Sequence, residues 1–195
     1  MSKEQKKNDE QIDYYYKNNR FFSILFATKK YRDLWKSKEA TVSFVLSLCV
    51  TTLLWYILLT NNYNPSVILE ITRNVIPILL GGFFSLLGLS IGGLAIITGT
   101  IEEDIITKIR DQGNIKTFIS IVYNFYFCGA LIGLSMLFSV IVFLITFIKL
   151  DFNPVFFWII SFMYNYMVFF SLIYSVMLLG TCIRIFLLRY RYMND

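Results

Sequence analysis

The sequence predicts an all-α membrane protein with four transmembrane helices and with both termini in the cytoplasm. Three observations lead to this fold class: long charge-free stretches, a low overall charge content, and a one-sided distribution of basic residues. The charge-free stretches lie between Glu39 and Glu70, between Arg73 and Glu102, between Lys116 and Lys149, and between Asp151 and Arg184. Each exceeds the roughly 20 residues that cross a bilayer core, where only a helix pairs all its own backbone groups.

The composition and the charge distribution agree with this reading. Hydrophobic residues make up 56% of the chain and charged residues 16%, against about 25% charged in soluble domains. Of the 18 Lys and Arg residues, all but Arg73 and Lys149 lie before the first stretch, between the second and third, or after the fourth. Because basic loops stay on the cytoplasmic side, the positive-inside rule places both termini there.

Residues 1–38 are expected to form a cytoplasmic tail followed by an interfacial segment. The adjacent Tyr14, Tyr15 and Tyr16 indicate either a contact for a partner or simply a Tyr-rich tail. Basic and aromatic side chains then gather before the first span, at Lys29, Lys30, Arg32, Trp35, Lys36 and Lys38. They predict either an amphipathic helix on an anionic leaflet or a basic flank that only fixes the topology.

Residues 39–188 are expected to form the transmembrane domain, with helices at about 40–60, 75–100, 117–148 and 156–188. In the loop before the second helix, Glu70 and Arg73 are spaced to pair on one helical turn. The third and fourth helices are joined by so short a turn that they must be antiparallel neighbours.

The remaining cytoplasmic elements are a middle loop and a C-terminal tail. Residues 101–116 repeat isoleucine every four positions and predict a second, short amphipathic helix. Its charged residues are candidates for partner binding, namely Glu102, Glu103, Asp104, Lys108 and Arg110. At the end of the fourth helix and in the tail 189–195, the basic residues expected at the membrane interface are Arg184, Arg189 and Arg191.

The sharpest local pattern is a stripe of small residues in the second span. Its members are spaced alternately four and three apart and fall on one helix face: Gly81, Ser85, Gly88, Gly92, Ala95 and Gly99. The third span repeats the theme with Gly129 and Gly133. Since lipid gives no hydrophobic drive for helix association, small residues favour it by allowing close backbone approach. The stripe therefore packs against a helix of the same chain, contacts another copy, or lines a pore.

No catalytic, metal or cofactor site is predicted. The chain contains no His, and Cys49, Cys128 and Cys182 are scattered through apolar runs. No Asp, Glu, Lys or Arg lies within a span core, which argues against a proton-coupled transporter. The amides of Asn124 and Asn165 are expected to seek hydrogen bonds between helices.

Residues 86–127 (LLGLSIGGLAIITGTIEEDIITKIRDQGNIKTFISIVYNFYF) run from a small-residue helix through a charged amphipathic piece into an aromatic helix. This order resembles the KwaA family, the membrane subunits of the Kiwa anti-phage defence system. The resemblance implies a homo-oligomer in the bacterial inner membrane that carries a cytoplasmic DNA-binding partner, KwaB, and helps to detect phage. No catalytic residue is carried over from that family.

Together these observations predict a non-enzymatic membrane scaffold or sensor subunit that forms homo-oligomers and recruits a soluble cytoplasmic protein. Direct nucleic-acid binding is not expected, because acidic residues dilute the basic N-terminal tail. One alternative is a small pore-forming, holin-like channel, which the Gly and Ser residues of the second span favour. Another is a protein that modifies or carries lipid.

Overall fold

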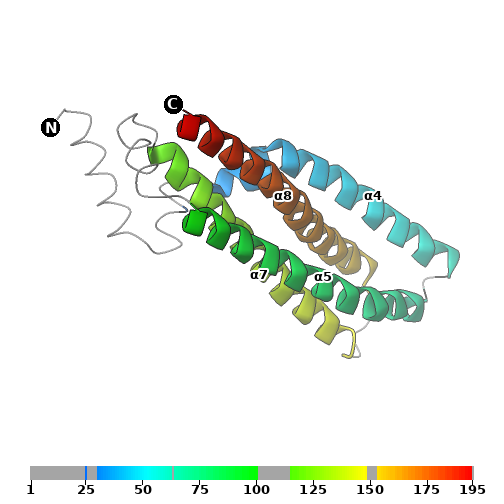
Figure 1. The fold of residues 1–195 in the computed structure, drawn as a ribbon. Coiled ribbons are helices and arrows are strands. Elements are labelled where there is room, and N and C mark those ends of the chain that lie inside the picture. Colours follow the sequence, from blue (N-terminus) through cyan, green and yellow to red (C-terminus); the bar gives the residue numbers. More distant parts are fainter. Residues whose placement is uncertain (1–24, 26–29, 63, 101–114, 149–152, 195) are drawn as a thin grey trace.

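A computed structural model of the protein describes residues 25, 30–62, 64–100, 115–148 and 153–194. Within these ranges the chain is helical, with short turns and no strand. Four long helices dominate it: α4 (Lys38–Thr60), α5 (Pro65–Thr100), α7 (Ile115–Ile145) and α8 (Pro154–Asn194). Two short pieces, η1 (Lys30–Arg32) and α3 (Asp33–Lys36), precede α4. Figure 1 shows the long helices side by side in an elongated bundle.

Each long helix is apolar enough to cross a membrane. The apolar segments are Lys38–Thr60, Ser66–Gly99, Ile119–Ile145 and Pro154–Ile183, with mean hydropathy from 2.0 to 2.6. Large apolar side chains cover the outside of the bundle, including Ile78 at 75% exposure and Leu137 at 65%. A soluble monomer rarely exposes so much apolar surface. These features confirm the prediction of an all-helical, multi-pass membrane protein.

The first span begins close to its predicted boundary. Ser37 is extended, and its hydroxyl accepts a hydrogen bond from the backbone N–H of Ala40 at 3.0 Å, which caps α4. The helix ends at Thr60, and the chain then turns at Asn62, whose φ of 52° lies in the left-handed region. Asn tolerates this conformation better than most residues, so the turn residues fix the end of the helix.

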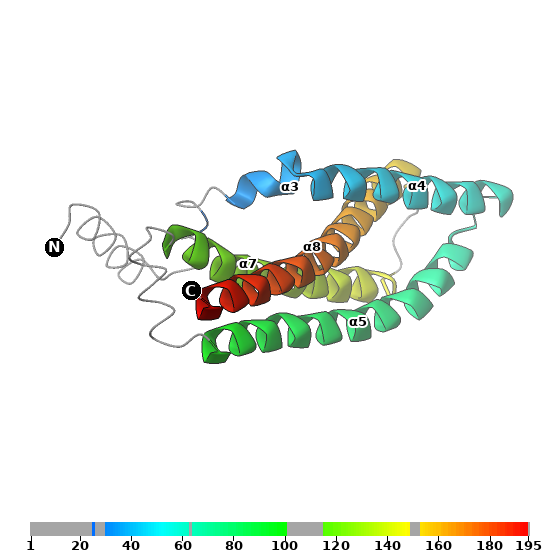
Figure 2. The ribbon, with the colours of Figure 1, turned by 45° about the horizontal axis from the view of Figure 1, so that its top comes forward.

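The second helix starts well before the predicted position of about 75. Pro65 occupies the start of α5, where its fixed φ suits a first helical turn. The Asn64 side chain accepts a hydrogen bond from the Ser66 backbone N–H at 3.1 Å and caps this end. The sequence reading treated Glu70 and Arg73 as loop residues because they are charged, whereas both lie in the helix. Figure 2 shows α5 curving toward α4 over its first turns.

The helices pack in the order α4, α8, α7, α5. The main contacts join α4 to α8, α8 to α7 and α7 to α5, and α4 has little contact with α5. Figure 2 shows α4 and α5 along opposite edges of the bundle. As predicted, α7 and α8 are neighbours. Because α5 is an edge helix, one side of it faces away from the rest of the chain.

The last two helices also differ in extent from the prediction. α7 ends at Ile145 and is followed by a turn at 146–148. α8 runs to Asn194 through the region predicted as a tail, and its 41 residues span roughly 60 Å. Since the fourth span was predicted to end at about 188, the end of α8 extends beyond the predicted membrane span.

Candidate functional site

The six small residues of the second span form an open surface on α5. We call this surface the α5 small-residue face: Gly81, Ser85, Gly88, Gly92, Ala95 and Gly99. A Cβ atom added at Gly81, Gly88, Gly92 or Gly99 would meet nothing within 4 Å. The hydroxyl of Ser85 donates to the Gly81 carbonyl of its own helix at 3.2 Å. The face therefore makes no close packing contact at its glycines within the described part of the chain.

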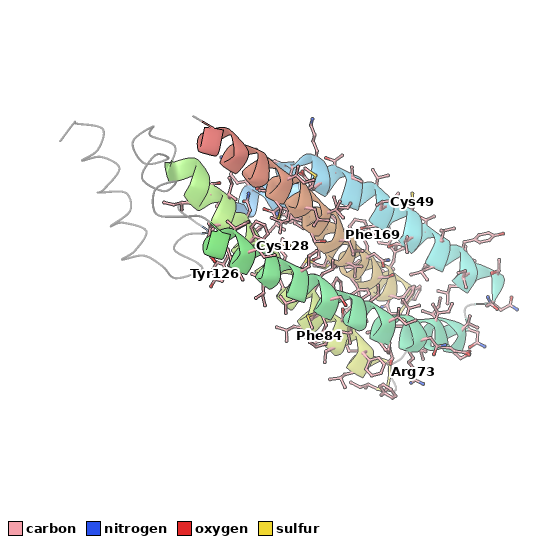
Figure 3. All side chains as sticks on the ribbon, in the orientation of Figure 1. Cys49, Arg73, Phe84, Tyr126, Cys128 and Phe169 are labelled. Atoms are coloured by element: carbon pink, nitrogen blue, oxygen red, sulfur yellow. The ribbon has the colours of Figure 1, made fainter. Side chains whose placement is uncertain are left out.

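The opposite side of α5 packs against α7. From Ile76 onward, the buried residues of α5 recur every seven positions, at Ile76, Phe83, Ser90 and Ile97. Gly92 follows Phe83 by nine residues, and at about 100° per residue this separation places the two on opposite sides of the helix. Phe84 follows the buried Phe83 in the sequence, and Figure 3 shows it on the outside of the bundle. Periodicity identified the stripe correctly as a single face, but the chain uses the other face for its own packing.

Close approach between α5 and α7 depends on glycines outside the predicted stripe. A Cβ atom at Gly93 would lie 2.8 Å from the Phe125 ring, so only glycine fits without a shift. The Ser90 hydroxyl donates to the Phe125 carbonyl oxygen at 3.0 Å in the same contact. A Cβ atom at Gly129 would lie 3.8 Å from both Leu87 and Ser90, so this predicted residue faces α5 of the same chain. A Cβ atom at Gly133 would meet nothing within 4 Å.

Buried hydroxyl residues join α4 to α8, a feature that the sequence reading missed. Ser43, Ser47 and Thr51 are each fully buried and recur every four residues on α4. The Asn165 amide of α8 donates to the Thr51 hydroxyl at 3.2 Å, which confirms the expected bond between helices for this residue. The Oδ1 atom of Asn124 is buried without a hydrogen-bond partner among the described residues, so the expected bond is not formed at this oxygen. The regular spacing of these three small residues was the signal that could have identified α4 as a packing helix.

A second hydroxyl cluster joins α7 to α8. Ser135 and Ser171 lie 2.7 Å apart between their hydroxyl oxygens, and Ser139 donates to the Tyr164 hydroxyl at 3.2 Å. Such small polar residues let helices approach closely and pair each other's hydroxyl groups in a medium without water. They pack beside aromatic contacts between the same two helices, in which the Phe127 and Tyr174 rings lie 5.4 Å apart.

Arg73 pins the ends of α5 and α7 together. Its guanidinium donates to the Thr146 hydroxyl at 3.3 Å and to the Thr146 backbone oxygen, just beyond the end of α7. It also lies 4.5 Å from the centre of the Phe147 ring. No ion pair joins it to Glu70 in the described residues, so the suggested pairing on one turn is wrong. Figure 3 labels Arg73 at this end of the bundle.

The predicted interfacial residues are only partly described. Arg32, Lys36 and Lys38 are exposed, and Trp35 is 81% exposed with its ring stacked 6.3 Å from that of Tyr166. The Tyr166 hydroxyl donates to the Leu34 carbonyl and holds α3 against α8. Lys30 begins η1, and Arg184, Arg189 and Arg191 lie in α8. Lys29 lies outside the described ranges, as do the other residues of 1–24 and 26–29, so an amphipathic helix over this whole segment stays a prediction.

The predicted partner-binding residues lie outside the described residues. They are Tyr14, Tyr15 and Tyr16 in the N-terminal tail and Glu102, Glu103, Asp104, Lys108 and Arg110 in the middle loop. Their roles stay predictions. Within the described ranges, no group of three His, Cys, Asp or Glu side chains is placed to hold a metal ion.

No protein-family model, curated protein or solved structure matches the chain.

Proposed function

We propose that the protein is a non-enzymatic, multi-pass membrane scaffold whose copies associate through the α5 small-residue face. One observation carries this proposal: the space around the Cβ positions of Gly81, Gly88, Gly92 and Gly99 is open. The glycine that the chain needs for its own packing is Gly93, on another side of α5. The glycines of the face therefore have no packing role in the described fold.

Physical cost supports a contact between copies. Glycine in a helix interior costs about 1 kcal/mol relative to alanine. Four glycines on a lipid-facing side therefore lower the stability of α5, and no packing contact within one copy offsets this cost. In a bilayer, such a face allows another helix to approach its backbone closely and to gain dispersion contacts. A second copy carries the same stripe, and a two-fold axis places the two stripes against each other.

We further propose that the assembled protein presents a surface outside the membrane to a soluble protein. α8 supports this idea, because it continues to Asn194, six residues past the predicted end of the fourth span at about 188, which is roughly 9 Å. The bias of basic residues favours the cytoplasm for this end. The resemblance to KwaA extends the proposal to the bacterial inner membrane and to anti-phage defence with a DNA-binding partner of the KwaB type.

Native mass measurement tests the scaffold proposal. The full-length protein is extracted in mild detergent or in lipid nanodiscs from its own host, and the mass of each complex is determined. We expect complexes with two or more copies, together with a stoichiometric soluble protein. A complex that contains a single copy at every protein concentration contradicts self-association, and the absence of any other polypeptide contradicts partner recruitment.

The alternative of a membrane pore has a separate test. Inside one copy the axis of the bundle is filled by Phe83, Ile132 and Phe170, each at most 1% exposed. A pore would have to lie between copies, and Ser85 is the only hydroxyl residue of the α5 small-residue face. We expect purified protein in planar bilayers to stay electrically silent across the voltage range. Reproducible unitary conductance that Ser85→Leu abolishes favours the pore instead.

A further inference from the structure

The charged segment that precedes α4 contacts the middle of the charge-free part of α8. The Tyr166 hydroxyl donates to the Leu34 carbonyl, and the Trp35 and Tyr166 ring centres lie 6.3 Å apart. Tyr166 follows Pro154, where α8 begins, by 12 residues, and it precedes Arg184, the first charged residue of α8, by 18. Figure 2 shows α5, α7 and α8 continuing past the start of α4. α3 therefore lies level with the middle of the membrane span of α8.

α7 provides a second marker of this depth. The hydroxyl oxygens of Ser135 and Ser171 lie 2.7 Å apart, and Ser139 donates to the Tyr164 hydroxyl at 3.2 Å. Leu137 lies between these two serines of α7, so it is level with the stretch of α8 that contacts α3. Its side chain is 65% exposed. Leu137 and α3 thus occupy the same depth on two different helices of the bundle surface.

The outer side of α3 and of the start of α4 is positively charged. Arg32, Lys36 and Lys38 are exposed, whereas Asp33 and Glu39 are only partly exposed. Charged side chains near the centre of a bilayer are costly unless local thinning brings headgroups and water to them. Snorkelling moves a charge only by the length of its own side chain, whereas the 18 residues from Tyr166 to Arg184 cover roughly 27 Å of helix. In a flat bilayer these charges would lie in hydrocarbon.

We propose that this surface binds the phosphate groups of phospholipids from the leaflet on the N-terminal side of α4. The phosphate oxygens accept hydrogen bonds from the guanidinium of Arg32 and from the ammonium groups of Lys36 and Lys38. Trp35 lies beside these residues at 81% exposure, and its amphipathic ring favours the headgroup level. The bilayer is then thinner beside α3 than beside Leu137. This binding does not depend on association of copies, because α4 and α5 lie along opposite edges of the bundle.

Fluorescence quenching by nitroxide-labelled lipids tests the depth of this surface. Full-length proteins with the native Cys residues changed to Ala carry one bimane label, at Lys36→Cys or at Leu137→Cys, and both keep Arg32 and Lys38. They are reconstituted in phosphatidylcholine vesicles with a minor fraction of nitroxide phosphatidylcholine, labelled either on the headgroup or near the end of an acyl chain. Leu137→Cys is the matched control because it lies at the same depth. Unfolding temperatures equal to that of the unlabelled Cys-free protein show that both variants are folded.

We expect the headgroup nitroxide to quench the label at position 36 more than the chain nitroxide does, with the reverse order at position 137. Arg32→Gln together with Lys38→Gln lowers the headgroup quenching at position 36 and leaves position 137 unchanged. The same order of quenching at both positions overturns the proposal, because the bilayer is then equally thick on both sides. Headgroup quenching that survives the two glutamines also overturns it. So does quenching at position 36 by aqueous iodide and by neither lipid, since water alone then fills this surface.

Discussion

Leucine at two glycines of the α5 small-residue face should separate assembly from folding. A Cβ atom at Gly88 or Gly92 meets nothing within 4 Å, so the double variant Gly88→Leu with Gly92→Leu places its new side chains outside the monomer. Leucine is also the better helix former by up to about 1 kcal/mol at each site. We therefore expect thermal stability of the monomer to be unchanged or slightly higher.

The same change should weaken contacts between copies. Helix axes in close contact are about 8–10 Å apart, depending on the side chains between them, and two leucines hold the backbones away from each other. Each lost pair of heavy atoms forfeits about 0.1–0.2 kcal/mol. Losing on the order of ten pairs costs about 1–2 kcal/mol, which raises the dissociation constant by about tenfold.

The assay is a dilution series in detergent, with the mass of the complex followed by light scattering and the unfolding temperature followed in parallel. Gly93→Leu is the matched control, because its Cβ atom would lie 2.8 Å from the Phe125 ring inside the monomer. Overpacking of this kind costs about 1–3 kcal/mol and should lower the unfolding temperature. If the double variant assembles like the wild type at every dilution, the α5 small-residue face does not join copies.

Three further substitutions test the internal packing. Arg73→Met removes donors to the hydroxyl and carbonyl of Thr146; we expect a loss of about 1.5–3 kcal/mol in thermal unfolding, with partial recovery in Arg73→Lys. Ser47→Leu inserts a large side chain at a fully buried position of α4 and should destabilise the protein by about 1–3 kcal/mol. Asn165→Leu removes the amide that donates to Thr51 and should cost only about 0.6 kcal/mol, resolved by a double-mutant cycle with Thr51→Val.

Each of these predictions has an outcome that contradicts it. Val45→Leu is the control for Ser47→Leu, because Val45 is exposed on the same helix; equal effects would mean that α4 does not bury its hydroxyl side. An unfolding temperature of Arg73→Met equal to that of the wild type would show that other groups satisfy the Thr146 carbonyl. A coupling energy of zero in the cycle would remove the bond between Asn165 and Thr51 from the account.

The number and type of helices could be predicted because the absence of charge over four long stretches leaves few alternatives in a bilayer. Boundaries were harder where local capping overrode polarity. Glu70 and Arg73 made the start of α5 look like a loop, yet the Asn64 cap and Pro65 begin the helix there. At the other end, α8 carries the basic residues that were predicted as a tail.

The functional face could be predicted as a pattern but not as a surface. The spacing of Gly81 through Gly99 assigns these residues to one side of a helix, and it carries no information on what that side contacts. The partner of α5 inside the chain is decided by Ser90 and Gly93, whose fit to Phe125 only the folded structure shows.

Disulfide cross-linking in intact membranes tests most directly whether the α5 small-residue face joins two copies. Single cysteines replace Ser85 or Ala95, which lie on the face, and Leu89 or Ile91, which are exposed beside it, in a background where the native Cys residues are changed to Ala. With a membrane-permeant oxidant, we predict covalent dimers from Ser85→Cys and Ala95→Cys and little from Leu89→Cys or Ile91→Cys. Equal yields at all four positions, or dimers from the flanking positions alone, contradict the account.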